Sequence, residues 1–168
     1  INFVIDSFNF VIIKMINKKK IDLIVYDFDG VMTDNSLLMD QDGKEYVRIS
    51  RADGLAVSEI KKMFLKQIIL STEKNPIVQK RAEKLEIDCL QGINNKKKTL
   101  STFAERQNIN LEKTIYVGND INDLEAMLLV GTRVCPSDSH QEILNVSDIV
   151  LNKKGGQGVI RELLDMLI

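Results

Sequence analysis

A short acidic motif placed directly after an apolar run constrains this chain most. Residues 21–26 are mostly apolar and β-favouring, and Asp27, Asp29 and Gly30 follow at once. Side chains two residues apart on a strand point to the same side, so we expect Asp27 and Asp29 to lie close together. Two carboxylates at that spacing need a cation or a shared proton. The motif predicts a Mg²⁺ site containing a nucleophile at the end of a buried strand, where open α/β sheets bind ligands. The structural alternative is a pair of solvated aspartates in a turn.

Composition limits the class of protein. The chain has 168 residues, 44% of them hydrophobic, which is enough for one domain with its own core. The net charge of −1 gives no electrostatic reason to expect nucleic acid or a membrane surface as partner. No apolar run approaches the roughly 20 residues that a membrane-spanning helix needs. Cys89 and Cys135 form no closely spaced pair, which fits a reducing cytoplasm better than a disulfide-bonded protein.

The first residues of the chain differ from the rest. Residues 1–16 are unusually apolar, but no small-residue cleavage site follows them, and the positive charges come after the apolar run. We therefore interpret residues 1–20 as a packed leader or the remnant of an upstream domain. Residues 21–168 then form the functional domain.

Strand-like and helix-like patterns alternate along that domain. We expect strands at residues 21–26, 67–70, 87–90, 114–117, 132–134 and 148–151, and helices at 52–65, 75–84, 96–106, 121–130, 139–144 and 158–168. Strands that alternate with helices indicate βαβ units. The predicted fold class is α/β, a three-layer Rossmann-like parallel sheet with helices on both faces.

One segment interrupts the alternation. Residues 37–49 carry a central Asp42-Gly43 pair between two β-favouring runs, which predicts a projecting β-hairpin near the acidic motif. The distance along the chain from Asp29 to Ser71 leaves room for this hairpin and one helix, but not for a cap domain. An open site that must exclude water favours an oligomer, in which another chain covers it.

Polar side chains recur where four strands should end. In chain order they are Asp27 with Asp29, then Ser71 with Thr72, then Lys96, and finally Asn119 and Asp120 with Asp123. Each group has a structural explanation by itself, such as a helix cap or a surface lysine. Their joint occurrence at successive strand ends favours one site.

This set of residues suits phosphoryl transfer. A carboxylate can serve as the in-line nucleophile, and we assign that role to Asp27. Asp29 can protonate the leaving oxygen and later deprotonate water. Ser71 and Lys96 can hold the phosphoryl oxygens, whose negative charge must be neutralised. Hard oxygen ligands suit Mg²⁺, and the candidate ligands are Asp27, Asp29, Asn119, Asp120 and Asp123.

The order Asp-x-Asp-Gly-x-x-Thr-Asp, Ser/Thr, Lys and Gly-Asn-Asp-x-x-Asp resembles the haloacid dehalogenase-like phosphatase superfamily over residues 21–168. The resemblance implies the roles just given. Many relatives carry aspartate directly after the glycine of the last motif, where this chain has Asn119. Which of Asn119 and Asp120 contacts the metal therefore stays open.

Three further segments narrow the resemblance. Residues 47–55, 89–93 and 155–162 are similar to the capless 3-deoxy-D-manno-octulosonate 8-phosphate phosphatases and to their kin acting on nonulosonate 9-phosphates. Some of these kin are phosphatase domains fused to acylneuraminate cytidylyltransferases. The resemblance implies a Mg²⁺-dependent phosphomonoesterase for a phosphorylated sugar acid. It also implies a homotetramer with shared sites, in which hairpins meet centrally and a glycine-rich tail reaches a neighbouring site.

A sugar acid carries a carboxylate, so at least one arginine should contact it. The candidate substrate-binding residues are Arg48, Arg51 and Arg161, together with Gly30, Thr33 and Thr72.

Two alternatives use the same residue types. A phospho-acceptor receiver domain also has an acidic cluster, but its acceptor aspartate lies on a middle strand, whereas Asp27 follows the first strand of the sheet. An inactive or weakly active phosphatase fold, kept for oligomerisation of a fused cytidylyltransferase, is the stronger alternative because of Asn119. His140, the only histidine, is expected on a surface helix without a catalytic role.

Overall fold

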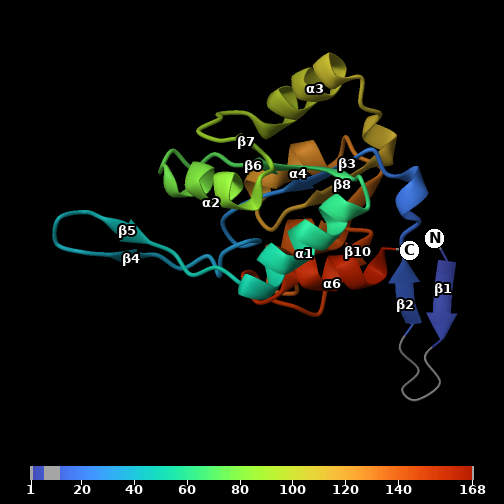
Figure 1. Cartoon of the computed structure of the whole chain (residues 1–168), viewed down its shortest axis with the longest axis horizontal. Helices are drawn as coiled ribbons and strands as arrows, with labels where there is room; N and C mark the ends of the chain where they lie inside the picture. Colours follow the sequence, from blue (N-terminus) through green and yellow to red (C-terminus); the bar gives the residue numbers. More distant parts are fainter. Residues whose placement is uncertain (1, 6–11, 168) are drawn as a thin grey trace.

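A parallel β-sheet forms the centre of the molecule (Figure 1). The computed structural model describes residues 2–5 and 12–167. Within them the sheet has six strands in the order β10-β9-β8-β3-β6-β7. The strands are β3 (Leu23–Tyr26), β6 (Lys66–Leu70), β7 (Asp88–Leu90), β8 (Thr114–Val117), β9 (Thr132–Cys135) and β10 (Ile149–Val150). The predicted α/β fold with a parallel sheet is confirmed.

Helices cover both faces of the sheet. They are α1 (Arg51–Lys62), α2 (Ile77–Leu85), α3 (Lys96–Gln107), α4 (Ile121–Met127), α5 (Gln141–Val146) and α6 (Val159–Met166). The first core contains buried residues of α1, α2 and α6, and the second contains those of α3, α4 and α5. Strand β3 contributes to both cores, because Ile24 faces one and Val25 the other.

The position of β3 determines where a site can form. All of its residues are buried, and it pairs with β6 on one side and β8 on the other. The chain runs from β3 to β6 and β7, and then returns to β8 across β3. The carboxyl ends of β3 and β8 therefore lie where the strand order reverses, which is the usual position of a ligand site in such sheets.

The predicted hairpin projects from the body of the molecule (Figure 1). Its strands, β4 (Leu38–Met39) and β5 (Glu45–Tyr46), are antiparallel, and a turn containing Gly43 at φ 77° joins them. The described chain between β3 and β6 contains only this hairpin and α1, so no cap domain is present there.

The N-terminal segment forms an antiparallel pair, β1 (Asn2–Ile5) and β2 (Ile12–Met15). The backbone N–H of Ile16 donates to the carbonyl of Met166 at 2.8 Å, which ties the segment to the end of α6. Residues 1 and 6–11 of the expected leader, and residue 168 of the last expected helix, lie outside the described residues. The origin of residues 1–20 stays a prediction.

Two further sequence features have structural counterparts. Cys89 on β7 and Cys135 on β9 are free thiols, and three strands, or about 19 Å, separate their positions in the sheet. In the part of the chain that the structure describes, no helix has the length and apolar character to cross a membrane.

The glycine-rich segment packs against a loop of its own chain, and its implied contact with a neighbouring copy's site stays a prediction. Gly155 and Gly156 pack against the backbone of residues 30–34, the loop after β3 of the same chain. The N–H of Gly156 donates to the carbonyl of Val31 at 3.0 Å. A Cβ on Gly155 would collide with the carbonyl group of Gly30. The segment therefore supports its own chain's acidic motif, because only glycine allows this backbone contact.

This contact yields a prediction. The Gly155→Ala substitution should destabilise the protein by about 1–3 kcal/mol, because the added methyl group must displace the backbone of the acidic-motif loop. Urea unfolding measures the effect. Gly43→Ala is a useful comparison, since a Cβ there meets no atom within 4 Å but is strained by the positive φ. A Gly155 variant no less stable than the Gly43 variant would contradict the packing role.

Candidate active site

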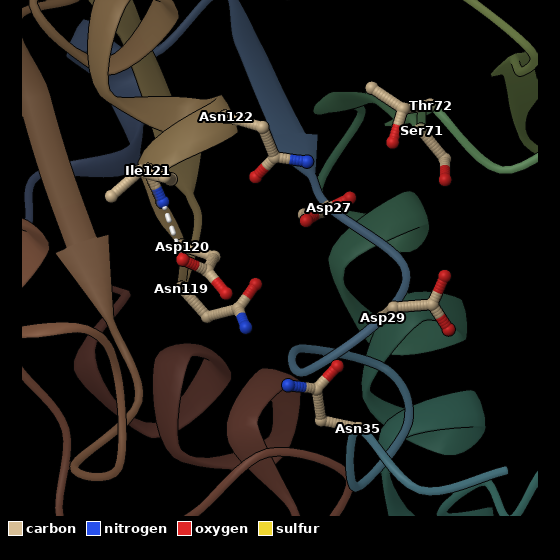
Figure 2. Close-up of a pocket in the computed structure, with 9 residues that line it drawn as sticks. All are labelled: Asp27, Asp29, Asn35, Ser71, Thr72, Asn119, Asp120, Ile121 and Asn122. Carbon is tan, nitrogen blue, oxygen red and sulfur yellow. Dashed lines mark hydrogen bonds between the residues drawn. The ribbon is translucent and has the colours of Figure 1, made fainter.

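A pocket of about 270 Å³ opens at the carboxyl ends of the central strands (Figure 2). It is lined by Asp27, Asp29, Asn35, Ser71, Thr72, Asn119, Asp120, Ile121 and Asn122. These residues follow β3, β6 and β8, which are neighbours in the sheet. The structure thus brings three of the four predicted groups to one pocket wall.

Asp27 sits at the base of this pocket. It continues the line of β3, and its N–H donates to the carbonyl of Val117 at 2.9 Å. Its Oδ1 accepts the N–H of Phe28 at 2.7 Å, which fixes the carboxylate against the loop. Only 4% of the residue is exposed, yet it lines the pocket, so its small exposed surface faces the pocket.

Lys96, the fourth predicted group, lies behind Asp27. It is the first residue of α3, whose N-cap is Asn95. Its Nζ lies 2.7 Å from Oδ1 of Asp27 and 2.6 Å from Oδ1 of Asp123, and its side chain is 1% exposed. The ammonium group therefore contacts the Asp27 carboxylate but does not line the pocket.

Asp123 corrects a sequence expectation. Its Oδ1 accepts from Lys96 and, at 2.8 Å, from the hydroxyl of Tyr116. Its Oδ2 accepts the N–H groups of Asn119 at 2.9 Å and Asp120 at 3.3 Å. Both oxygens are occupied and the residue is fully buried, so Asp123 positions its neighbours rather than binding a metal directly.

The buried group around Lys96 is not balanced in charge. Lys96 contributes one positive charge, and Asp27 and Asp123 contribute two negative charges. Burial and, to a lesser extent, the nearby Asp123 carboxylate raise the pKa of Asp27 to about 8, although Lys96 opposes both effects. One ammonium group does not neutralise two carboxylates. A second cation at the pocket side of Asp27 would restore the ionised carboxylate that nucleophilic attack requires.

Asn119 and the backbone of Asp29 provide a place for that cation. One terminal atom of the Asn119 amide lies 3.2 Å from Oδ2 of Asp27 and 2.8 Å from the carbonyl oxygen of Asp29. With nitrogen at this position, the amide donates to both oxygens. With oxygen there, three hard oxygen atoms face one another, which is a donor set that suits Mg²⁺. The residues present therefore fit a divalent cation.

Gly30 allows this approach. It adopts a positive φ of 77°, and a Cβ there would collide with the Asn119 amide. Thr33 is buried, and its Oγ1 accepts the N–H groups of Gly30 and Asn35, each at 3.2 Å. Neither Gly30 nor Thr33 lines the pocket. Both residues shape the loop after β3, and their expected substrate contacts stay a prediction.

Asp27 and Asp29 line the same pocket, but strand alternation does not set the direction of the Asp29 carboxylate. β3 ends at Tyr26, so the two-residue period does not extend through the motif. Figure 2 shows the Asp29 carboxylate directed away from Asn119 and Asp120. Thr33 donates weakly to its Oδ1 at 3.4 Å. Burial raises the pKa of Asp29, and the nearby Glu73 and Glu45 carboxylates add to this effect.

Ser71, Thr72 and Asp120 complete the pocket wall. The N–H of Ser71 donates to the carbonyl of Leu90 at 2.9 Å, and its Oγ accepts the N–H of Glu73 at 3.1 Å. Asp120 is the N-cap of α4, and its Oδ1 accepts the N–H of Ile121 at 2.7 Å. Asp120 lines the pocket, whereas Asn119 contacts the oxygens of Asp27 and Asp29.

The three candidate arginines lie outside this pocket. Arg48 pairs with Asp34 at 2.7 Å at the base of the hairpin. Arg51 is exposed at the start of α1, and Arg161 lies on α6, where its Nε is 3.5 Å from Asp165. None of the three lines the pocket around Asp27, and their expected contact with the substrate carboxylate stays a prediction.

Three pocket residues were missed from the sequence. Asn35 has a positive φ of 60°, and Ile121 and Asn122 begin α4. A signal existed for Asn35, since asparagine tolerates the left-handed region and follows the acidic motif closely. His140, predicted on a surface helix, is the exposed N-cap of α5, and its N–H donates to the carbonyl of Asn119 at 2.8 Å.

The raised pKa of Asp27 gives a stability prediction. Because the folded protein holds a proton on Asp27 above the ordinary carboxyl pKa, the free energy of unfolding of the metal-free protein should fall between about pH 5 and pH 8. Asp27→Asn should flatten this dependence and raise stability at about pH 8. Urea unfolding with a chelator present measures it.

Asp22→Asn, which removes an exposed carboxylate at the other end of β3, is the matched control and should keep the wild-type slope. Identical slopes for wild type and Asp27→Asn would show that Asp27 is ionised throughout this range.

Comparisons with known proteins agree with this geometry. The profile of the haloacid dehalogenase-like hydrolase family matches residues 7–163. The 3-deoxy-D-manno-octulosonate 8-phosphate phosphatase of Escherichia coli K12 is 31% identical over 151 residues, which are 89% of this chain and 80% of that protein. The Haemophilus influenzae protein of the same description is 29% identical over 89% of this chain and 84% of its own length.

Solved structures give the same result. A Streptomyces avermitilis protein assigned to the haloacid dehalogenase family has a TM-score of 0.88 and 41% identity, and the match covers 91% of this chain and 94% of that one. The octulosonate 8-phosphate phosphatase of Moraxella catarrhalis has a TM-score of 0.84 and 28% identity, and the match covers 88% of this chain and 86% of that one. It was solved with a magnesium ion, a phosphate ion and a KDO molecule. The chain is therefore a phosphoric monoester hydrolase and belongs to the haloacid dehalogenase-like hydrolase family, in the group that contains these phosphatases.

Proposed function

We propose that this protein is a Mg²⁺-dependent phosphomonoesterase that acts on a phosphorylated 2-keto-3-deoxy sugar acid through an aspartyl-phosphate intermediate. The substrate is an octulosonate 8-phosphate or a nonulosonate 9-phosphate. One observation carries the proposal. Oδ1 of Asp27 is held by Lys96 and the N–H of Phe28, while Oδ2 faces Asn119 at the open pocket. The relatives that act on the octulosonate support the substrate class.

The chemistry follows from the positions of the side chains. An oxygen of Asp27 attacks the phosphorus atom in line with the leaving oxygen, which forms the aspartyl phosphate and breaks the ester P–O bond. Asp29 gives its proton to the leaving oxygen, and its raised pKa favours the protonated form from which a general acid starts. Asp29 then takes a proton from the water that attacks the same phosphorus atom, which releases phosphate and restores Asp27.

The remaining residues bind and orient. Ser71 and Thr72 place hydroxyl groups at the pocket wall, where they can donate to phosphoryl oxygens. Asp27, the carbonyl of Asp29 and Asn119 would hold the cation, which when bound neutralises charge on the phosphoryl group. Two relatives were crystallised with such ions, magnesium in the Moraxella catarrhalis phosphatase and cobalt in that of Haemophilus influenzae.

The alternative from the sequence is a weakly active or inactive oligomerisation domain of a bifunctional acylneuraminate cytidylyltransferase. It rests on Asn119, a neutral amide in a position where a second carboxylate beside Asp27 would bind a cation more strongly. The contacts of Asn119 with Asp27 and Asp29 favour the active form, since a neutral amide oxygen still completes a Mg²⁺ donor set.

We further propose a cytoplasmic homotetramer in which the hairpins associate. Leu38 is 74% exposed and Met39 60%, and both lie on the projecting β4. Apolar side chains that cluster on such an arm are typical of an interface. Assembly would also explain why the three candidate arginines lie outside the pocket of their own chain. Arg48, Arg51 and Arg161 could then reach the site of a neighbouring copy.

The first test of this proposal is phosphate release. Wild-type protein should release phosphate from the sugar acid phosphate and from a small aryl phosphate only when Mg²⁺ is present. Asp27→Asn should lower the rate by at least about a thousandfold, because the covalent step is lost, while Asp22→Asn keeps it. Release that survives in Asp27→Asn, or continues with a chelator, would contradict the mechanism. Absence of release from wild type would favour the inactive alternative.

A second test addresses assembly. The double substitution Leu38→Asp and Met39→Asp should convert the tetramer to a folded monomer, since charges on the hairpin oppose burial of its apolar face. Sedimentation velocity measures the state. Phe64→Asp, at a residue 96% exposed between α1 and β6, is the matched control and should remain tetrameric. A wild-type protein that sediments as a monomer would refute the assembly.

A further inference from the structure

A second cavity adjoins the catalytic pocket. It has a volume of about 280 Å³ and shares Asp29 and Asn35 with the pocket around Asp27. Its other lining residues are Ser36, Leu37, Glu45, Val47, Glu73, Asn75 and Ile77. They come from the hairpin, from the loop after β6 and from the start of α2. A ligand whose phosphoryl group sits at Asp27 would extend into this cavity.

Two glutamates of the cavity are held in place by hydrogen bonds. Oε2 of Glu45 accepts from Nδ2 of Asn75 at 2.7 Å, which connects the hairpin to α2. Oε1 of Glu73 accepts the N–H groups of Lys74 at 2.6 Å and Asn75 at 2.7 Å. Among the described residues, the second oxygen of each carboxylate accepts no hydrogen bond. Each glutamate thus offers a fixed acceptor to a ligand.

The charged side chains that line the cavity are all acidic. Glu45, Glu73 and the shared Asp29 are acidic, and among the described residues of this chain no lysine or arginine lines the cavity or the pocket around Asp27. The remaining wall includes the apolar side chains of Val47 and Ile77. A wall of this kind accepts hydrogen bonds from hydroxyl groups and packs against carbon, but it repels a second anionic group placed beside the phosphate.

We propose that this cavity binds the hydroxyl-bearing, uncharged carbons next to the phosphate ester, and that Glu45 and Glu73 reject esters carrying a carboxylate there. The inference rests on the proposed function, which places the phosphoryl group at Asp27. It deepens that function by assigning two specificity-determining residues. An octulosonate 8-phosphate fits, because its ester and its carboxylate are at opposite ends of the carbon chain, with hydroxyl groups near the ester.

Binding of two small phosphonates tests this inference without any turnover. The first is the non-hydrolysable analogue of glycerol phosphate, which ends in a diol. The second is the analogue of phosphoglycerate, in which a carboxylate replaces the terminal hydroxymethyl group. Calorimetry with Mg²⁺ present gives both dissociation constants. Wild-type protein should bind the diol at least about tenfold more tightly than the carboxylate, because of like-charge repulsion at the cavity wall.

Glu45→Gln and Glu73→Gln isolate the charge, because a glutamine oxygen can still accept the hydrogen bonds that hold each side chain. Each substitution should reduce the preference for the diol by about three- to tenfold, mainly through tighter binding of the carboxylate. Glu83→Gln, at an exposed position on the outer side of α2, is the matched control and should keep the wild-type ratio.

Equal dissociation constants in wild type, a ratio unchanged in both glutamine variants, or absence of diol binding would overturn the inference. None of these results depends on catalysis, so they differ from a failure of the proposed function, which would appear as absent phosphate release from an aryl ester. A protein that releases phosphate yet binds both phosphonates equally would keep its function and lose the assigned specificity.

Discussion

The ammonium group of Lys96 is the cation on which the rest of the site depends. It lies between the carboxylates of Asp27 and Asp123 and is almost fully buried with them. Through these contacts it joins the loop after β3 to the starts of α3 and α4. Removal of the Lys96 ammonium group would leave two buried carboxylates without a counter-charge, and an uncompensated buried charge typically costs about 3–5 kcal/mol. The fold therefore fixes Asp27, the proposed nucleophile, by the same interaction that connects the loop after β3 to α3 and α4.

The incomplete charge balance of this group connects structure with chemistry. Two carboxylates face one ammonium group, and burial raises the pKa of Asp27 to about 8. The protein by itself therefore favours a protonated, unreactive Asp27 near neutral pH. A divalent cation held by Asp27, the Asp29 carbonyl and Asn119 would reverse this preference, because an adjacent positive charge favours the ionised form. The proposed metal dependence would then follow from electrostatics, because the ion would both activate the carboxylate and neutralise the incoming phosphate.

The sequence predicted the features that depend on local pattern. Buried strands, helix caps and the Asp42-Gly43 hairpin follow from side-chain periodicity and turn chemistry, so the α/β sheet and the convergence of Asp27, Ser71 and Asn119 could be expected. Features that depend on tertiary contacts could not be predicted from the sequence. The saturation of Asp123 requires Lys96, 27 residues away in the chain, and Tyr116 on the preceding strand β8, and the orientation of Asp29 depends on where β3 ends. The contact between Gly155 and the acidic-motif loop joins residues far apart in the chain, which no single-sequence pattern encodes.

The central claim is that Asp27 receives the phosphoryl group while a divalent cation lies between it, the carbonyl of Asp29 and Asn119. A crystal structure of the protein with Mg²⁺ and beryllium fluoride, a mimic of a phosphoryl group bound to a carboxylate, tests this most directly. The account predicts that the beryllium fluoride is bonded to an Asp27 carboxylate oxygen and that the cation contacts Asp27, the Asp29 carbonyl and Asn119. Beryllium fluoride bound to Asp29, or a cation held by Asp123 instead, would contradict it.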